Sequence, residues 1–200
     1  MKKFIMMAVM AVAALTASAQ KGEFHITPHV SLGYAHISDM SDFESNISGA
    51  IGAEAEYMIS NQFGLSLGAD YKYIRSLNKT KTHNGTETKA YFDYSYLNLP
   101  VLAQIHFGEG FAFKAGVQPM FLLTADEHLD KESSHSTSYH NDSFKDELES
   151  FLLAVPVGIS YTFGVPVTVD VRCNIPTGKI NKHGDSCKMT DIAISVGYRF

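Results

Sequence analysis

Apolar and polar residues alternate along the carboxyl-terminal stretch 190–200. The apolar residues of this stretch are Ile192, Ile194, Val196, Tyr198 and Phe200. Because successive side chains of a β-strand point to opposite faces, a period of two predicts a strand with one apolar and one polar face. The chain is therefore expected to end in an amphipathic strand whose last residue is aromatic.

The same period of two recurs in earlier segments of the chain. These segments are 24–34, 47–59, 63–73, 97–107, 111–123, 151–163 and 165–171. In each of them aliphatic or aromatic residues occupy one face, and polar, charged or small residues occupy the other. Together with the last strand they predict an all-β fold of eight strands.

The connections between these strands alternate in length, which a soluble sandwich does not require. Short turns are expected at 60–62, at 108–110 and around Gly164. Long polar loops are expected at 38–46, 75–90, 124–150 and 176–190. Short turns on one side and long loops on the other are typical of outer-membrane barrels, whose short turns face the periplasm. We therefore predict an eight-stranded antiparallel up-and-down transmembrane β-barrel.

Aromatic residues gather at both ends of the expected strands. Near the short turns lie Phe24, Tyr57, Phe63, Phe107, Phe111, Tyr161, Phe163, Tyr198 and Phe200, and near the long loops lie Tyr34, Tyr71, Tyr73, Phe121 and Phe151. Two aromatic girdles around an aliphatic band are what the two membrane interfaces favour. The alternative is a soluble eight-stranded barrel of the lipocalin type. Such a barrel turns its apolar face inward and has no need of two girdles.

The amino terminus has the pattern of a secretory signal peptide. Lys2 and Lys3 precede an apolar stretch, and the small residues 17–19 form a cleavage site, so that Gln20 is expected to begin the mature chain. We therefore expect a signal peptide over 1–19, a barrel domain over 20–200 and a location in the cell outer membrane. Without the two lysines the charge falls from -5 to 14 basic minus 21 acidic residues, or -7, so nucleic acid is not an expected partner.

Four passages resemble the PorT-like outer-membrane β-barrel family. They are 96–102 (YLNLPVL), 113–119 (FKAGVQP), 155–159 (VPVGI) and 196–200 (VGYRF). The resemblance covers the mature chain and implies its fold and location more than an activity. The final strand ending in Phe200 is similar to the signal that directs outer-membrane barrels to their insertion machinery. That machinery and the outer-membrane lipids are the expected partners, together with an extracellular ligand at the loops if there is one.

Charged residues fall on the face that the alternation assigns to the barrel interior. They are Glu54, Glu56, Asp70, Lys72, Lys114, Asp170, Arg172 and Arg199. The interior of an eight-stranded barrel is just wide enough to be filled by side chains, and unpaired buried charges are costly. We therefore predict a plug of salt bridges, which is favoured over a proton or ion pathway.

The other sequence patterns that could indicate a metal site or a disulfide are weak. Imidazoles and carboxylates in the expected loop 124–150 fit no defined metal spacing. The loop residues concerned are Asp126, Glu127, His128, Asp130, Glu132, His135, His140 and Asp142. A short helix is expected over 143–151, with Ser143 as its cap. Cys173 and Cys187 flank the last external loop, as a disulfide or as free thiols.

A possible catalytic pair lies at the end of the first strand. His36 and Ser38 there are similar to the pair of outer-membrane lipid A deacylases, but Asp39 follows where that family has Asn. The pair also lies in the first strand and not in a late one. We assign no catalytic residue, no metal ligand and no cofactor. The favoured reading is a barrel with a plugged lumen and a structural or surface-binding role, and the alternatives are a narrow transport channel or a lipid-modifying rim enzyme.

Overall fold

The computed structural model of the chain describes residues 22–37, 43–78, 81–83, 86–133, 136–143, 145–182 and 188–200. The expected signal peptide 1–19 lies outside these residues. The strands are β1 (Phe24–Ile37), β2 (Phe43–Met58), β3 (Phe63–Asn78), β4 (Lys81–His83), β5 (Thr86–Asn98), β6 (Val101–Phe107), β7 (Phe111–Ser133), β8 (Ser136–Ser143), β9 (Phe151–Thr162), β10 (Val167–Pro176) and β11 (Met189–Tyr198). One 3-10 helix, η2, spans Lys145–Glu147.

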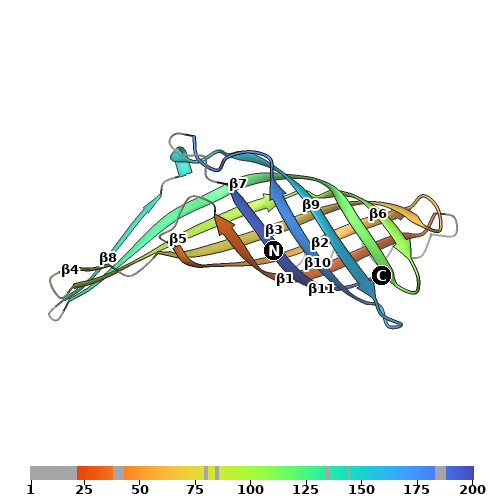
Figure 1. Cartoon of the computed structure of the whole chain (residues 1–200), viewed down its shortest axis with the longest axis horizontal. Coiled ribbons are helices and arrows are strands. Elements are labelled where there is room, and N and C mark those ends of the chain that lie inside the picture. The colour runs from red at the N-terminus through yellow and green to blue at the C-terminus, as the bar shows by residue number, and fades with distance from the viewer. Residues whose placement is uncertain are drawn as a thin grey trace, which may run out of the picture.

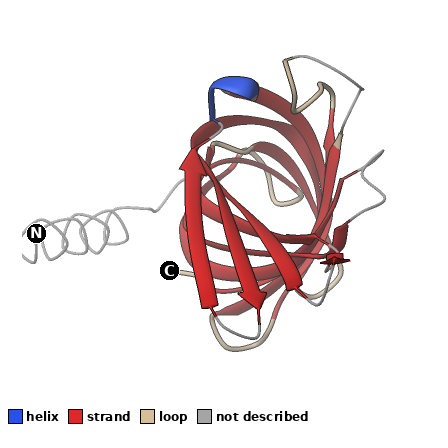
Figure 2. Cartoon of the chain, turned by 90° about the vertical axis from the view of Figure 1, so that its left-hand side faces the viewer, coloured by secondary structure: helices blue, strands red, loops and turns tan. Residues whose placement is uncertain are grey.

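The strands close into a barrel (Figures 1 and 2). Each wall strand pairs antiparallel with its neighbour in the order β1, β2, β3, β5 with β6, β7, β9, β10 and β11. The last strand returns to the first, since β11 pairs antiparallel with β1 from His29 opposite Gly197 to Ile37 opposite Met189. Counting β5 and β6 as one, the wall has eight strands, which confirms the predicted barrel.

The fourth wall strand is interrupted, whereas the sequence predicted a continuous strand over 97–107. β5 ends at Asn98 and β6 begins at Val101. Pro100 lies between them and has no N–H to donate to a neighbouring strand. The wall stays connected there, because the Leu99 N–H donates to the carbonyl oxygen of Pro119 (2.9 Å) and the Gly68 N–H donates to that of Pro100 (2.8 Å).

Two of the expected long loops are wrong, because the chain there forms strands that extend beyond the barrel (Figure 1, left). The expected loop 75–90 contains the end of β3, the short β4 and the start of β5, and the expected loop 124–150 contains the end of β7 and all of β8. β5 and β7 stay paired from Asn98 opposite Met120 to Glu87 opposite Glu132. With β4 and β8 at their outer edges they form a projecting sheet, which we call the stalk.

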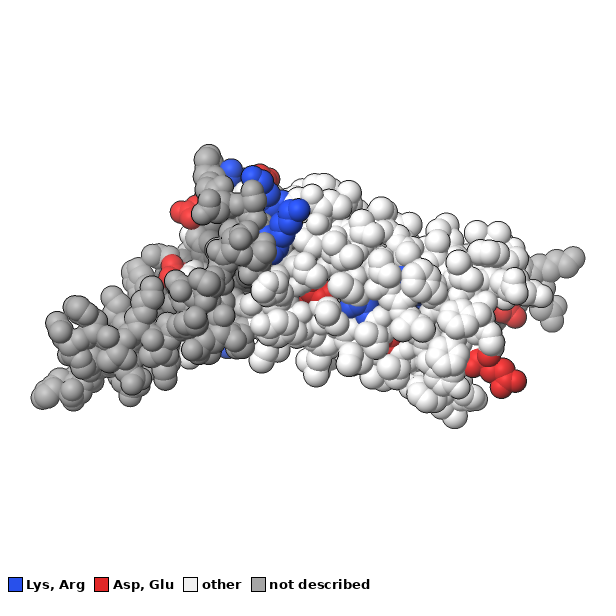
Figure 3. Space-filling model, viewed as in Figure 1, with Lys and Arg blue, Asp and Glu red and all other residues white. Residues whose placement is uncertain are grey.

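The predicted inward and outward faces are confirmed in the described wall. Outward apolar residues such as Leu32, Ile51 and Leu67 are at least 60% exposed, while the inward residues between them are buried or partly buried. In the space-filling view the wall is mostly white, with a few red and blue atoms visible between the outward residues and larger charged groups toward its ends (Figure 3). No helix within the described residues is long and apolar enough to cross a bilayer.

Aromatic rings pack against one another at the ends of the wall. At the short-turn end the Phe111 and Tyr161 ring centroids are 4.6 Å apart, and those of Tyr198 and Phe200 are 4.7 Å apart. At the long-loop end the centroids of Phe121 and Phe151 are 5.4 Å apart. Adjacent wall strands therefore bring predicted girdle residues into contact at both levels.

A charge placed on the outward face should reveal the depth of each position. Val157 lies mid-wall on β9, so Val157→Arg should lower the free energy of unfolding by about 2–4 kcal/mol. Val165 lies in the turn after β9 and is 60% exposed, so Val165→Arg should lower the free energy of unfolding by only about 0–1 kcal/mol. Denaturant titrations of both variants in phospholipid vesicles measure the difference. Equal costs would mean that β9 does not cross the hydrocarbon at Val157.

Candidate functional site

The middle of the barrel interior holds a cluster of ion pairs that crosses the lumen. Its centre is the carboxylate of Glu54, a buried residue of β2. Glu54 accepts hydrogen bonds from Lys114 Nζ (2.9 Å), from Gln104 Nε2 (2.7 Å) and from Arg172 Nη2 (3.0 Å). Lys114 is on β7 and Arg172 on β10, neither of which neighbours β2 in the wall. These contacts therefore join opposite sides of the barrel.

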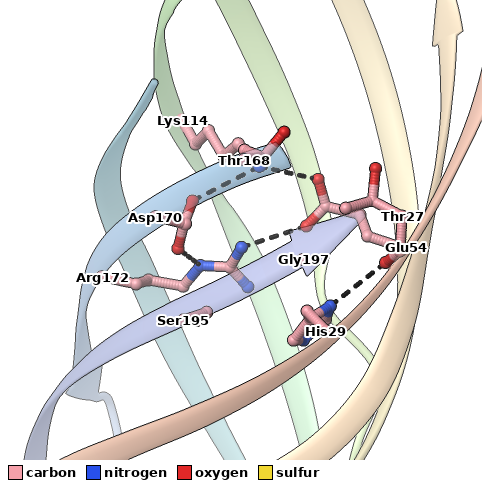
Figure 4. A pocket seen from close by; sticks show the side chains of 9 residues that line it. All are labelled: Thr27, His29, Glu54, Lys114, Thr168, Asp170, Arg172, Ser195 and Gly197. Atoms are coloured by element: carbon pink, nitrogen blue, oxygen red, sulfur yellow. Dashed lines mark hydrogen bonds and ion pairs between the residues drawn. The ribbon is translucent and has the colours of Figure 1, made fainter. Parts of the chain in front are cut away.

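A second carboxylate completes this cluster. Asp170, on β10, has Oδ2 3.3 Å from Lys114 Nζ and Oδ1 3.3 Å from Arg172 Nε. Two acids and two bases thus alternate around the group, as the dashed lines in Figure 4 show. Such alternation offsets part of the cost of taking four charges out of water.

Glycines make room for two of these contacts. Gly52 on β2 lies between His29 of β1 and Asp70 of β3 in the strand register. A Cβ at Gly52 would meet Asp70 Oδ1 and the backbone oxygen of Ala69. Without it, His29 Nε2 lies 3.1 Å from Asp70 Oδ1 across the intervening strand.

Gly158 of β9 makes room for the second contact, on the opposite side of the barrel. It lies between Lys114 of β7 and Arg172 of β10. A Cβ there would lie 2.7 Å from the Val171 carbonyl oxygen. Its absence leaves Lys114 and Arg172 free to converge on Glu54.

Two further polar groups lie along the lumen. Toward the short turns, Glu56 contacts His106 Nε2 (2.6 Å) and Arg199 Nη2 (3.2 Å). Toward the long loops, Asp191 contacts Lys72 Nζ (2.5 Å) and accepts hydrogen bonds from Ser48 Oγ (2.8 Å) and Asn174 Nδ2 (3.0 Å). All eight charged residues predicted to face inward are buried or partly buried, and each has an ion-pair partner.

A cluster of buried apolar residues lies in the interior toward the long loops, which the sequence did not predict. The buried residues there are Ala35, Ile74, Tyr94, Tyr96, Met120, Leu122, Ala125, Leu148, Leu152, Ala154, Ile180 and Met189. Most of them come from wall strands. Leu148 and Ile180 instead come from the two connections that follow η2 and β10.

These two connections are bound to each other at the long-loop end of the barrel, and we call them the lid (145–150 and 177–182). The Glu149 N–H donates to the Ile180 carbonyl oxygen (2.8 Å), and the Lys182 N–H donates to that of Glu147 (3.1 Å). The helix expected over 143–151 is reduced to η2. Ser143 does not cap it, because its hydroxyl donates to the Ala125 carbonyl oxygen (3.2 Å).

A cavity of about 20 Å³ adjoins the Glu54 cluster. It lies among the side chains labelled in Figure 4, including His29, Thr168 and Ser195. A volume of this size accommodates about one water molecule.

Other residues considered from the sequence lie apart from this cluster. His36 is exposed on the outward face of β1, and Ser38 lies outside the described residues. Cys173 is partly buried on β10, and Cys187 lies outside the described residues. In the described part of the chain, no three His, Cys, Asp or Glu side chains converge as metal ligands do.

Comparison with known families identifies the chain. Residues 4–200 match the model of the outer membrane protein beta-barrel domain. The chain belongs to this family. It is therefore an integral protein of the cell outer membrane. A search of curated proteins finds no match.

Solved structures of outer-membrane barrels are similar to this chain. Ail, the attachment invasion locus protein of Yersinia pestis, is 11% identical, with 90% of this chain and 100% of that chain covered and a TM-score of 0.48. OprG of Pseudomonas aeruginosa is 14% identical, with 90% and 97% covered and a TM-score of 0.43. Neisserial surface protein A is 16% identical, with 90% and 100% covered and a TM-score of 0.41.

Neutralising the central carboxylate should destabilise the barrel. Glu54→Gln leaves Lys114 and Arg172 with Asp170 as their remaining ion-pair partner among the described residues, so we expect a loss of about 3–5 kcal/mol in the free energy of unfolding. Glu109→Gln removes an exposed acid from a short turn and should change the free energy of unfolding by less than about 0.5 kcal/mol. Denaturant titrations in vesicles compare the two. Equal stability of both variants would show that the Glu54 contacts contribute nothing.

Proposed function

We propose that this protein is a closed, non-catalytic outer-membrane barrel that holds the stalk at the cell surface as a structural or ligand-binding element. We further propose that it is a PorT-like member of its family. The barrel supplies a rigid anchor in the membrane. The stalk supplies polar strands outside the membrane, where an extracellular ligand would bind.

The observation that supports closure best is the set of contacts that crosses the lumen. Glu54 on one wall binds Lys114 and Arg172 on the other, so their side chains occupy the axis of the barrel. The adjoining cavity holds about one water molecule, which is far less than a hydrated ion pathway needs. An ion passing this level would have to displace paired charges.

The lid supports closure at a second level. Leu148 and Ile180 are 9% and 6% exposed and lie in the buried apolar cluster toward the long loops. An ion that entered from outside would have to pass these apolar side chains, which offer no ligands in place of its water shell. Two barriers of different chemistry thus lie in series.

We propose that the insertion machinery recognises the final strand. β11 is amphipathic and is followed by Phe200, whose N–H donates to the Ile26 carbonyl oxygen (2.9 Å). The last strand therefore completes the barrel by pairing with the first. Assembly of the barrel would then depend on recognition of this strand by the insertion machinery.

Conductance across a planar bilayer tests the proposed function. Purified wild-type protein, with insertion verified by its faster migration on unheated than on boiled detergent gels, should give no steady current. Removing the crossing contacts in Lys114→Ala/Arg172→Ala should produce intermittent current if that variant still inserts. Steady, ion-selective current through the wild type would overturn closure and support the narrow-channel alternative.

A further inference from the structure

The ion pairs inside the described barrel contain more acids than permanent cations. Five carboxylates take part, against four lysine or arginine side chains. The acids are Glu54, Glu56, Asp70, Asp170 and Asp191, and the bases are Lys72, Lys114, Arg172 and Arg199. Because a buried carboxylate without a cation is costly, the lumen needs one more positive charge.

Asp70 is the carboxylate that lacks a lysine or arginine partner. Among the described residues it is paired with His29, whose Nε2 lies 3.1 Å from Asp70 Oδ1. The two side chains are 11% and 9% exposed, so water offers little compensation. Glu56 also contacts a histidine, His106, but Arg199 supplies a permanent positive charge there. His29 therefore has to supply the missing charge.

The surroundings of the His29 ring favour a proton on both of its nitrogens. Nδ1 donates to the Thr27 carbonyl oxygen (3.3 Å; Figure 4), and Nε2 faces the Asp70 carboxylate on the other side of the ring. A carbonyl oxygen and an ionised carboxylate can only accept hydrogen bonds, whereas a neutral imidazole has a single N–H. The form of His29 that suits both neighbours is the imidazolium ion.

The other groups around His29 form a balanced set of their own. The cavity beside the ring is lined by four charged side chains, and β11 contributes the uncharged Ser195 and Gly197. The charged residues are Glu54 of β2, Lys114 of β7, and Asp170 and Arg172 of β10. These four pair with one another. The charge of Asp70 is therefore compensated by the proton on His29.

We propose that His29 is a pH-sensitive lock of the barrel interior. While it is protonated, it joins β1 to β3 across Gly52 of the intervening β2. When it loses the proton, Asp70 stays charged without a partner and the contact between the two strands is released. Histidine in an unfolded chain titrates near pH 6.5, so the contact contributes fully below about that pH and is lost as the pH rises. Alkaline conditions therefore loosen the packing of the lumen.

The pH dependence of unfolding in phospholipid vesicles tests this proposal. Relative to the wild type, Asp70→Asn should gain stability as the pH rises, because a neutral His29 beside an amide needs no proton. The ratio of the two unfolding constants should change roughly tenfold or more between about pH 6 and pH 9, since one linked proton allows up to tenfold per pH unit. His36→Gln removes an exposed histidine of the same strand and should follow the wild type. A constant ratio for Asp70→Asn would overturn the proposal.

Nuclear magnetic resonance of isotope-labelled histidines in the detergent-purified protein reads the proton directly. At about pH 6 the wild type should show an imidazolium signal for His29, identified by its absence from His29→Gln. Asp70→Asn should convert that signal to the neutral form, because a buried imidazole without a carboxylate partner gives up its charge. A neutral His29 at that pH in the folded wild type would overturn the proposal. Neither measurement involves ionic current, so the result is distinct from that of the conductance test.

Discussion

The hydrocarbon of the membrane leaves a polypeptide no partner for an unpaired backbone N–H or carbonyl, and the architecture of this protein follows from that constraint. The sheet has to close, and it does so through the pairing of β11 with β1. Closure with eight strands fixes a narrow interior. Side chains on the inward face must then meet one another and not water.

In this narrow interior, the inward charges favour one register of the strands over the others. A slip of one residue in any strand would exchange its two faces and present charges such as Glu54 or Arg172 to lipid. The correct register instead brings these two side chains together, although 118 positions separate them in the chain. The ion pairs therefore select one arrangement of the wall, even though the desolvation of charges offsets much of their attraction.

The sequence predicted the wall and its two faces, because lipid demands an apolar residue at every second position. It did not predict the length of β5 and β7, since neither face of the stalk has to be apolar outside the membrane and the alternation fades. The alternation of apolar and polar residues assigned Glu54 and Lys114 to the interior. It could not predict that they form an ion pair, because that contact depends on the register of distant strands. Leu148 and Ile180 were also missed, as single apolar residues within polar loops carry no periodic signal.

The central claim is that Glu54 and Arg172 bind each other across the lumen. A double-mutant cycle with Glu54→Gln, Arg172→Gln and the combined variant measures this directly as a coupling in the free energy of unfolding in phospholipid vesicles. We predict a coupling of about 1–3 kcal/mol, because the second substitution removes a charge that the first has left uncompensated. Additive effects would contradict the account, since the two side chains would then not interact.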